Sequence, residues 1–148
     1  MKKKILILGV TGQDGSYLMD FLIKKKYEVH GLIRKSATGN TKNIDHVINN
    51  PKLFNKSFFL HRGDLLDAVS LNNVIKKVQP AEIYNFADQD HVRWSFELPA
   101  YSFAVTGTSV VNLLEVIKKY SYKSKYFQPL SSNMFANSKN KKQNEKEP

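Results

Sequence analysis

Cysteine is absent from this chain of 148 residues. Its absence excludes disulfide bonds, thiolate metal sites and cysteine nucleophiles. Long apolar runs are also missing, since no stretch approaches the roughly 20 residues that span a bilayer. The run after Lys2, Lys3 and Lys4 is only about half as long as the apolar region of a signal peptide, and no small-residue cleavage site follows it. We therefore expect a cytoplasmic chain with no membrane partner.

Acidic residues are scarce: 13 Asp and Glu stand against 23 Lys and Arg, which gives a net charge of +10. A charge of this size can indicate a nucleic-acid partner. Most of these lysines, however, lie at the ends of predicted helices or beside predicted strands. Aromatic residues do not alternate with them, as they do in proteins that bind single-stranded nucleic acids. The pattern favours a solvated basic surface and leaves a nucleic-acid partner as the weaker alternative.

Apolar runs alternate with helical patterns along the chain, and this alternation is typical of a parallel sheet with helices on both faces. Strands are expected at residues 4–9, 28–34, 57–62, 82–86 and 125–130. Right-handed crossovers would arrange them in the order 3-2-1-4-5, with a ligand crevice where the first and fourth strands diverge. The predicted fold class is α/β, a doubly wound parallel sheet of the Rossmann type that is incomplete and lacks a substrate domain.

Helical periodicity predicts three main crossovers. They cover residues 16–25, the stretch from the capping residue Asp67 to Lys77, and the stretch from Pro99 to Lys119. A short helix is expected at 44–48 within a polar loop. The side chains expected to face the sheet are Tyr17, Leu18, Phe21 and Leu22 in the first helix, Val69, Val74, Ile75 and Val78 in the second, and Val105, Val111, Leu114 and Ile117 in the third.

The end of the chain differs from the rest in composition. Residues 137–148 are almost entirely Asn, Ser, Lys, Gln and Glu, without apolar periodicity. Such a segment cannot bury enough apolar surface to fold, so we expect a disordered polar tail. Residues 1–136 are assigned to a single NAD(P)-binding domain.

The most informative motif is the sequence GVTGQDG at residues 9–15, which lies between the apolar run at 5–8 and the first predicted helix. A strand, a glycine turn and a helix N-terminus in this order present backbone N–H groups to a pyrophosphate. The spacing G-x-x-G-x-x-G is typical of extended short-chain dehydrogenases, and a tight turn without a ligand is the alternative. The expected cofactor contacts in this motif are Gly9, Thr11, Gly12, Gln13, Asp14 and Gly15.

The second predicted strand ends in Arg34 and Lys35, where NAD-specific proteins place an Asp or Glu for the ribose 2′-hydroxyl. A guanidinium there would pair with a 2′-phosphate, so we expect NADP rather than NAD, with a solvated strand end as the alternative. Asp64 follows the third strand and would accept a hydrogen bond from the adenine amino group, or else cap a turn. Leu65 and Ala87 complete the expected cofactor site.

The loop after the fourth strand contains His91 and Trp94. His91 has no partner ligands at a suitable spacing, so no metal site is expected, and Trp94 is interpreted as a packing residue. The same loop carries Asp88 and Asp90. Their carboxylates would repel a bound pyrophosphate unless Lys or Arg compensates or the loop turns away.

Other stretches fit the same interpretation: VTGQDGSYL at 10–18, YEVHG at 27–31, NIDH at 43–46, GDL at 63–65, QPAEIYN at 79–85 and SFELP at 95–99. Together they resemble the N-terminal part of the GDP-mannose 4,6-dehydratase family, which are extended short-chain dehydrogenases/reductases. The resemblance implies a Rossmann domain that binds NADP and a nucleotide sugar such as GDP-mannose. In that family hydride leaves sugar C4 for the cofactor, water is lost across C5 and C6, and hydride returns to C6.

The resemblance also assigns roles at the end of the fifth strand. Ser131 would orient the C4 hydroxyl, whereas Asn133 stands where the family has a catalytic Glu, and an amide cannot act as a carboxylate base. No tyrosine in the sequence is followed four residues later by lysine, as the family's acid/base pair requires. Three alternatives follow: the NADP-binding part of a dehydratase, a catalytically silent module, or a 4-epimerase or 4-keto reductase in a longer chain. Either a homo-oligomer or a pairing with an intact paralogue is compatible with them.

Overall fold

A computed structural model describes residues 2–37, 39–131, 135 and 143–144. Its centre is a five-stranded sheet in the order β3-β2-β1-β4-β5, and every neighbouring pair is parallel. The strands are β1 Lys4–Leu8, β2 Glu28–Ile33, β3 Phe58–Arg62, β4 Glu82–Asn85 and β5 Lys125–Phe127. This is the Rossmann-like order that was predicted, and all five strands were found in the sequence.

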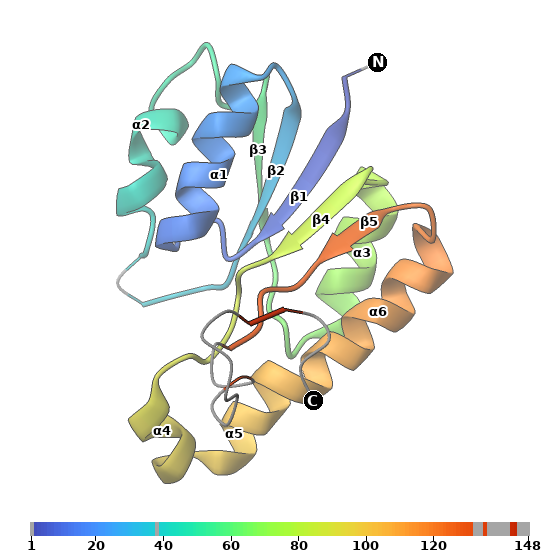
Figure 1. The fold of residues 1–148 in the computed structure, drawn as a ribbon. Coiled ribbons are helices and arrows are strands. Elements are labelled where there is room, and N and C mark those ends of the chain that lie inside the picture. The colour runs from blue at the N-terminus through green and yellow to red at the C-terminus, as the bar shows by residue number, and fades with distance from the viewer. Residues whose placement is uncertain (1, 38, 132–134, 136–142, 145–148) are drawn as a thin grey trace.

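Helices flank the sheet on both sides, with α1 and α2 on one side and α3 and α6 on the other (Figure 1). Their bounds are α1 Gln13–Lys24, η1 Lys42–Ile44, α2 Asp45–Ile48, α3 Ala68–Val78, α4 Val92–Glu97, α5 Pro99–Phe103, η2 Ala104–Thr108 and α6 Ser109–Tyr120. The segments α5, η2 and α6 follow one another without a gap, and η2 is a π-helical turn. Helix α4 was not predicted, because its residues were assigned to a polar loop.

Each face of the sheet has its own apolar core. On the α1 side, Ile5, Ile7 and Phe58 are buried with residues from α1 and α2. On the α3 side, Leu6 and Leu8 are buried with residues from α3 and α6. The alternation of odd and even residues in β1 between the two cores follows from the two-residue period of a strand.

The buried faces of the helices differ in part from the prediction. In α1, Tyr17 and Phe21 are exposed, and Gly15, Ser16, Met19 and Leu22 are buried. The small residues Gly15 and Ser16 let the helix backbone approach β1, so that this face turns inward instead of the aromatic one. The predicted inward residue Val69 of α3 is also exposed.

The long helical stretch shows a similar shift. Val105 and Ile117 are buried as predicted, but Val111 and Leu114 are exposed and Leu113 and Val116 take their place. The buried residues Val105, Ser109, Leu113 and Val116 recur every three to four residues, as residues on one face of a continuous helix do. The prediction combined Val105 with Val111 and Leu114, which lie on the opposite, exposed face.

Two helix starts agree with the sequence signals. The carboxylate of Asp67 caps α3, since its Oδ1 accepts from the backbone N–H of Val69 at 3.0 Å and of Ser70 at 3.2 Å. Pro99 occupies the first turn of α5, where its missing N–H needs no partner.

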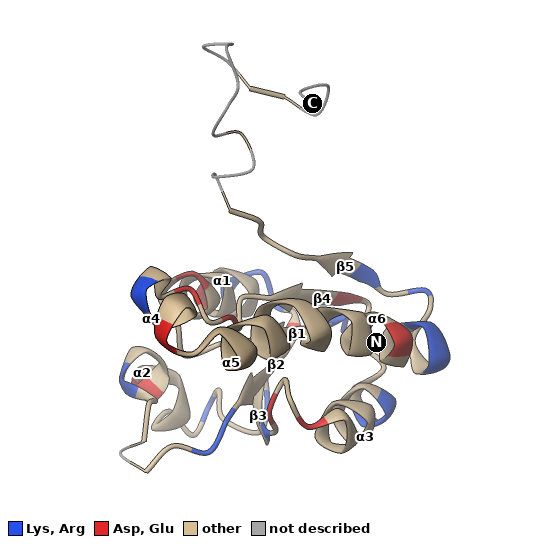
Figure 2. Ribbon diagram, turned by 90° about the horizontal axis from the view of Figure 1, so that it is seen from below, with Lys and Arg blue, Asp and Glu red and all other residues tan. Residues whose placement is uncertain are grey.

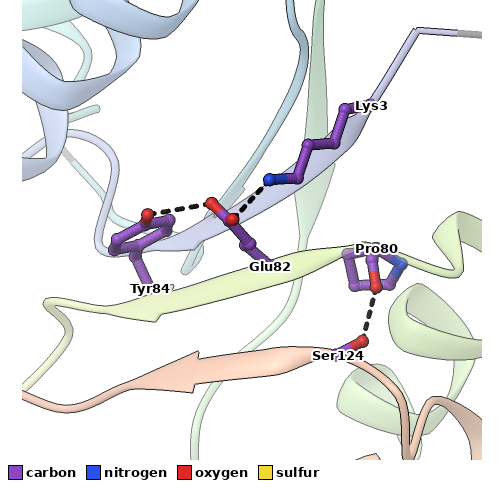
Figure 3. A network of polar contacts seen from close by, with 5 residues as sticks. All are labelled: Lys3, Pro80, Glu82, Tyr84 and Ser124. Carbon is purple, nitrogen blue, oxygen red and sulfur yellow. Dashed lines mark hydrogen bonds and ion pairs between the residues drawn. The ribbon is translucent and has the colours of Figure 1, made fainter.

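The polar network of Figure 3 joins β1 to β4 at the amino end of the sheet. The ammonium of Lys3 lies 2.5 Å from Glu82 Oε1, and the hydroxyl of Tyr84 donates to Glu82 Oε2 at 2.9 Å. The hydrogen bond from Lys3 lowers the pKa of the Glu82 carboxyl, and burial raises the pKa of Tyr84. Beside this network, the Ser124 hydroxyl donates to the carbonyl of Pro80 and ties the start of β5 to that of β4.

Pro99–Tyr120 forms one continuous 22-residue helical stretch that is long and apolar enough to cross a membrane by length and composition. The expectation that no stretch approaches this length was therefore too strong. Four of its side chains, Val105, Leu113, Val116 and Ile117, are buried in the core on the α3 side, and the core helix of a soluble protein passes the same test. The packing favours a core helix.

Basic residues are distributed over several elements, including α3, α6 and β5 (Figure 2). Several flank helix ends, such as Lys76 and Lys77 in the last turn of α3 and Lys118 and Lys119 in that of α6, where cations stabilise the helix dipole. Most of the predicted tail, residues 137–148, lies outside the described residues, and its expected disorder stays a prediction.

Candidate functional site

A crevice of about 840 Å³ opens at the carboxyl ends of the strands. Its walls come from the turn after β1, the ends of β2 and β3, the loop after β4, and the helices α4 and α5. This is where a doubly wound sheet binds its ligands, because the chain diverges to opposite sides there. Its volume lies within the range of about 300–1,000 Å³ typical of ligand pockets.

The glycine turn is shaped by contacts that only glycine permits. Gly9 has a φ of 75°, and a Cβ on it would lie 2.7 Å from the backbone nitrogen of Ala87. A Cβ on Gly15 would overlap the carbonyl oxygen of Gly9 and lie 2.9 Å from the Cα of Val10. Gly9 thus lets the turn pass against the β4 loop, and Gly15 lets α1 start directly against β1.

Gly12 differs from these two glycines because it faces the crevice. A Cβ on Gly12 would meet only the Gly9 carbonyl oxygen, at 3.3 Å, and its φ of −71° is open to any residue. Gly12 is also the N-cap of α1, and no side chain caps the helix there. The first-turn amides of α1 therefore keep their capacity to bind an anion.

Seven of the eleven predicted cofactor residues line the crevice: Gly9, Thr11, Gly12, Arg34, Asp64, Leu65 and Ala87. The other four do not line it. Gln13 and Asp14 are exposed in the first turn of α1, Gly15 is buried beneath that turn, and Lys35 is exposed in the loop after β2. Gly15 contributes by allowing close helix packing rather than by facing the crevice.

The end of β3 supplies one wall. Asp64 Oδ1 accepts a hydrogen bond from the backbone N–H of Leu66 at 2.9 Å, so Asp64 caps a turn, as one of the two alternatives for this residue predicted. Asp64 also lines the crevice, and its other carboxylate oxygen is available to a ligand donor. Arg62, the last residue of β3, lines the same wall and was not singled out from the sequence.

A buried amide positions the loop after β4. Asn85 is 1% exposed, and its Oδ1 accepts from the backbone N–H of Ala87 at 3.2 Å. Its Nδ2 donates to Gln128 Oε1 at 2.9 Å, and Gln128 also accepts from the Tyr126 hydroxyl at 2.5 Å. Burial raises the pKa of Tyr126. These contacts lock the ends of β4 and β5 together, which fixes the position of Ala87 beside the glycine turn.

Further along this loop, Gln89 joins two helices. Its Oε1 accepts from the backbone N–H of His91 at 2.8 Å, and its Nε2 donates to the hydroxyl of Ser102 on α5 at 2.8 Å. Asp88 Oδ1 accepts from the hydroxyl of Thr106 at 2.5 Å. The sequence alone did not single out Gln89, because its partners are brought together only by the fold.

The loop carboxylates Asp88 and Asp90 both line the crevice, so the loop does not turn them away. His91 and Trp94 line it as well, with their rings 5.2 Å apart. Within the described ranges, three or more His, Cys, Asp or Glu side chains do not gather where they could hold a metal ion.

The crevice does not include the predicted catalytic residue Ser131. This residue is exposed. Asn133 lies outside the described residues, so its role stays a prediction.

Comparisons with known proteins agree with this architecture. The family described as GDP-mannose 4,6 dehydratase matches residues 6–148. A GDP-mannose 4,6-dehydratase of Vibrio cholerae is 44% identical over 137 residues, which cover 91% of this chain and 37% of the relative. GDP-mannose 4,6 dehydratase 2 of Arabidopsis thaliana is 48% identical over 139 residues, 90% of this chain and 37% of the relative. The chain thus spans little more than a third of the length of these relatives.

Solved structures agree in fold. UDP-Glc/GlcNAc 4-epimerase of Campylobacter jejuni has a TM-score of 0.69 at 23% identity, over 84% of this chain and 36% of that one. UDP-glucose 4-epimerase of Thermus thermophilus, solved in complex with NAD, has a TM-score of 0.65 at 27% identity, over 79% and 34%. The family model matches nearly all residues of the chain, and the sheet has the Rossmann-like strand order with a glycine turn at its crevice. The chain therefore belongs to the GDP-mannose 4,6-dehydratase family.

Proposed function

We propose that this chain is the NADP-binding part of a nucleotide-sugar dehydratase that acts on GDP-mannose or a related sugar in the cytoplasm. The observation that carries the proposal is the turn of residues 9–15, where Gly9 and Gly15 allow a close backbone approach and Gly12 opens on the crevice. The uncapped N-terminus of α1 adds amide donors at the same place. A pyrophosphate needs this combination of space and N–H groups.

The choice of NADP over NAD rests on the end of β2. Arg34 follows this strand and lines the crevice, where a carboxylate would accept from the ribose 2′-hydroxyl of NAD. A guanidinium cannot accept a hydrogen bond, but it can donate two to a phosphate. Lys35 is exposed beside it and adds positive charge. We infer that the 2′-phosphate of NADP occupies this end of the crevice.

Each part of the chain has a role in this proposal. The glycine turn and α1 bind the pyrophosphate, and Asp64 with Leu65 borders the adenine. Ala87, held by Asn85, lies beside the turn and lines the crevice. When bound, NADP supplies reversible hydride transfer. Ser131 orients the sugar C4 hydroxyl, and Asn133 lacks the carboxylate that would remove the C5 proton.

Calorimetric titration with NADPH and with NADH tests cofactor binding. We expect NADPH to bind at least tenfold more tightly than NADH. Gly12→Ala places a methyl group in the crevice and leaves the backbone in an allowed conformation, so it should weaken both cofactors tenfold or more with little change in melting temperature. A folded wild-type chain that releases no heat with millimolar NADPH would rule out the proposal.

A catalytically silent module is the second candidate. Asn133 and the lack of a Tyr-x-x-x-Lys sequence favour it for these 148 residues. Such a module would act by pairing with an intact paralogue or with a second copy. Incubation with GDP-mannose and NADP tests this candidate, because formation of a 4-keto-6-deoxy sugar requires a dehydratase and would exclude a silent module. A 4-epimerised or 4-reduced sugar would instead indicate the epimerase or reductase alternative.

A further inference from the structure

Arginine is rare in this chain, which has 20 lysines and only three arginines. Arg93 lies on α4 and pairs with Glu97 at 2.7 Å. The other two, Arg34 and Arg62, both line the crevice. In a chain that uses lysine for most of its positive charge, two guanidinium groups in one cavity indicate a site that needs planar, bidentate donors.

The sheet places these two arginines at adjoining strand ends. Ile33, the last residue of β2, is the register partner of Arg62, the last residue of β3. The backbone N–H of Gly63 then donates to the Ile33 carbonyl at 3.0 Å and extends the pairing by one residue. Arg34 therefore leaves β2 one residue beyond the register partner of Arg62, and the β2–β3 pairing fixes the spacing of the two backbones.

Both guanidinium groups are available to a ligand. Among residues 2–37 and 39–131, neither Arg34 nor Arg62 takes part in an ion pair, and the ion pairs of this region involve Arg93, lysines and histidines. The neighbouring carboxylate of Asp64 is engaged through Oδ1 with the Leu66 amide. Two unpaired cations in one wall repel each other, and a dianion between them would relieve that repulsion.

The rest of this wall suits a phosphate. Asn40 and Thr41, from the loop between β2 and η1, line the same crevice as the two arginines. Asn43 Nδ2 donates to the carbonyl of Thr11 at 2.9 Å and ties this loop to the glycine turn. Residues at the ends of β2 and β3 bring Arg34, Arg62 and Asp64 to the crevice, whereas the β4 loop brings the carboxylates of Asp88 and Asp90.

We propose that Arg62 is a specificity-determining residue, a second guanidinium that binds the 2′-phosphate of the cofactor together with Arg34. This inference rests on the proposed function, because it needs a dinucleotide in the crevice. It adds a residue from β3 to the 2′-phosphate site that sequence reasoning places at the end of β2 alone. Arg62 donates hydrogen bonds to the oxygens of the 2′-phosphate and does not contact the rest of the dinucleotide.

The test compares ligands with and without the 2′-phosphate. Wild-type chain, Arg62→Gln, Arg62→Lys and the matched control Arg93→Gln are titrated with NADPH, NADH, 2′,5′-ADP and 5′-AMP. We expect Arg62→Gln to weaken NADPH and 2′,5′-ADP tenfold or more, with NADH and 5′-AMP changed less than twofold. Arg62→Lys keeps the positive charge but loses the bidentate guanidinium. Its affinity for NADPH and 2′,5′-ADP should therefore lie between those of the wild type and Arg62→Gln. Arg93→Gln, outside the crevice, should match the wild type.

Each other outcome overturns a stated claim. If the wild type prefers NADPH and Arg62→Gln keeps that preference, Arg62 plays no part and the inference fails while the proposed function stands. If Arg62→Gln weakens the binding of all four ligands equally, Arg62 contacts the adenine or stabilises the fold instead of binding the 2′-phosphate, and the inference fails. If the folded wild type binds neither dinucleotide but binds 2′,5′-ADP through Arg62, the phosphate site is real and the proposed pyrophosphate site is wrong.

Discussion

The parts of this chain before and after residue 90 differ in how completely their apolar side chains are covered. Of the 23 apolar residues buried in the described structure, 19 precede residue 90, and the other four lie on the stretch Pro99–Tyr120. Exposed large apolar side chains show the opposite distribution, because 11 of the 15 in the described ranges lie between Val92 and Leu130. The part before residue 90 is the closed half of the molecule, and the part from α4 to β5 is the open half.

The aromatic residues of β4 and β5 show the physical origin of this difference. The rings of Tyr84 and Phe127 lie 5.8 Å apart and those of Phe86 and Phe127 lie 6.1 Å apart, which makes a cluster on the α1 side of the sheet. Phe127 stays 48% exposed, whereas Phe58 on β3, in the core on the α1 side, is fully buried beneath α1 and α2. A strand is stabilised by apolar burial only where a helix crosses its face.

The largest expected effect is in the closed half, at the junction of β1 and α1. In Gly15→Ala the new methyl group would overlap the backbone of Gly9 and Val10, so α1 must move away from the sheet. We expect a loss of more than about 3 kcal/mol in the free energy of unfolding, measured by urea denaturation. Gly12→Ala is the matched control and should cost less than about 1 kcal/mol. Equal losses in the two variants would contradict the packing described here.

The next effect concerns pH and two histidines at the β2–β3 pair. His30 Nε2 lies 3.0 Å from Glu28 Oε1 and therefore donates to it, which leaves His30 Nδ1 to accept from His61 Nε2 at 2.9 Å. Burial lowers the pKa of both rings, and that of His61 falls to about 4. Lys4 and Lys77 also face the pair and disfavour its protonation.

A histidine with a lowered pKa in the folded state stabilises the fold fully above its unfolded pKa of about 6.5. This stability is lost as the pH falls from about 6.5 towards 4, and the His61 shift corresponds to about 2 kcal/mol after allowance for its partial exposure. Melting temperature measured from pH 7.5 to 4 should fall more steeply for the wild type than for His61→Phe. A slope for His61→Phe equal to that of the wild type would contradict the role given to His61.

A smaller effect is expected in the open half. Phe127→Ser should cost about 1 kcal/mol, because half of the ring is already in contact with water, whereas Phe58→Ser should cost more than about 4 kcal/mol. Phe127→Ser should also reduce self-association in sedimentation or light-scattering measurements, since an exposed aromatic cluster beside an edge strand favours aggregation. A Phe127→Ser variant as unstable as Phe58→Ser would show that the open half is covered in solution.

The smallest effect is expected at the network of Figure 3. Tyr84→Phe removes the hydrogen bond from Tyr84 to Glu82 but keeps the ring and the Lys3–Glu82 pair. We expect a loss of about 0.5–1 kcal/mol in the free energy of unfolding and a small rise in the pKa of Glu82, which NMR titration can measure. An unchanged Glu82 pKa would mean that Lys3 alone sets it.

Local sequence patterns predicted most of the fold. The five apolar runs each became a strand, and the capping carboxylate of Asp67 and the first-turn proline Pro99 each marked a helix start. The buried face of a helix was harder to predict, as Tyr17 and Phe21 show. Apolar periodicity does not reveal which face has side chains small enough for the helix to approach a strand. In the long helical stretch the buried Val105, Leu113 and Val116 do follow a regular helical period, but the prediction took Val111 and Leu114 from the exposed face.

The candidate site divides in the same way. Gly9, Gly12 and Arg34 were predicted because the glycine turn and the strand end are each local in sequence. Arg62 and Gln89 were missed, since their importance depends on partners from other elements. One usable signal for Arg62 was its place at the end of a predicted strand, where parallel sheets gather their functional side chains.

Taken alone, the amino-acid sequence was enough to establish the five strands and the main helices, though not α4, together with the place of the glycine turn and the family to which the chain belongs. These features depend on residues within about ten positions of one another, so they can be inferred from local patterns. Three arrangements required the folded chain: Arg34 and Arg62 share a wall, His30 and His61 are hydrogen-bonded, and β4 and β5 keep an open aromatic face. They depend on strand register and helix crossing, which join residues far apart in the chain.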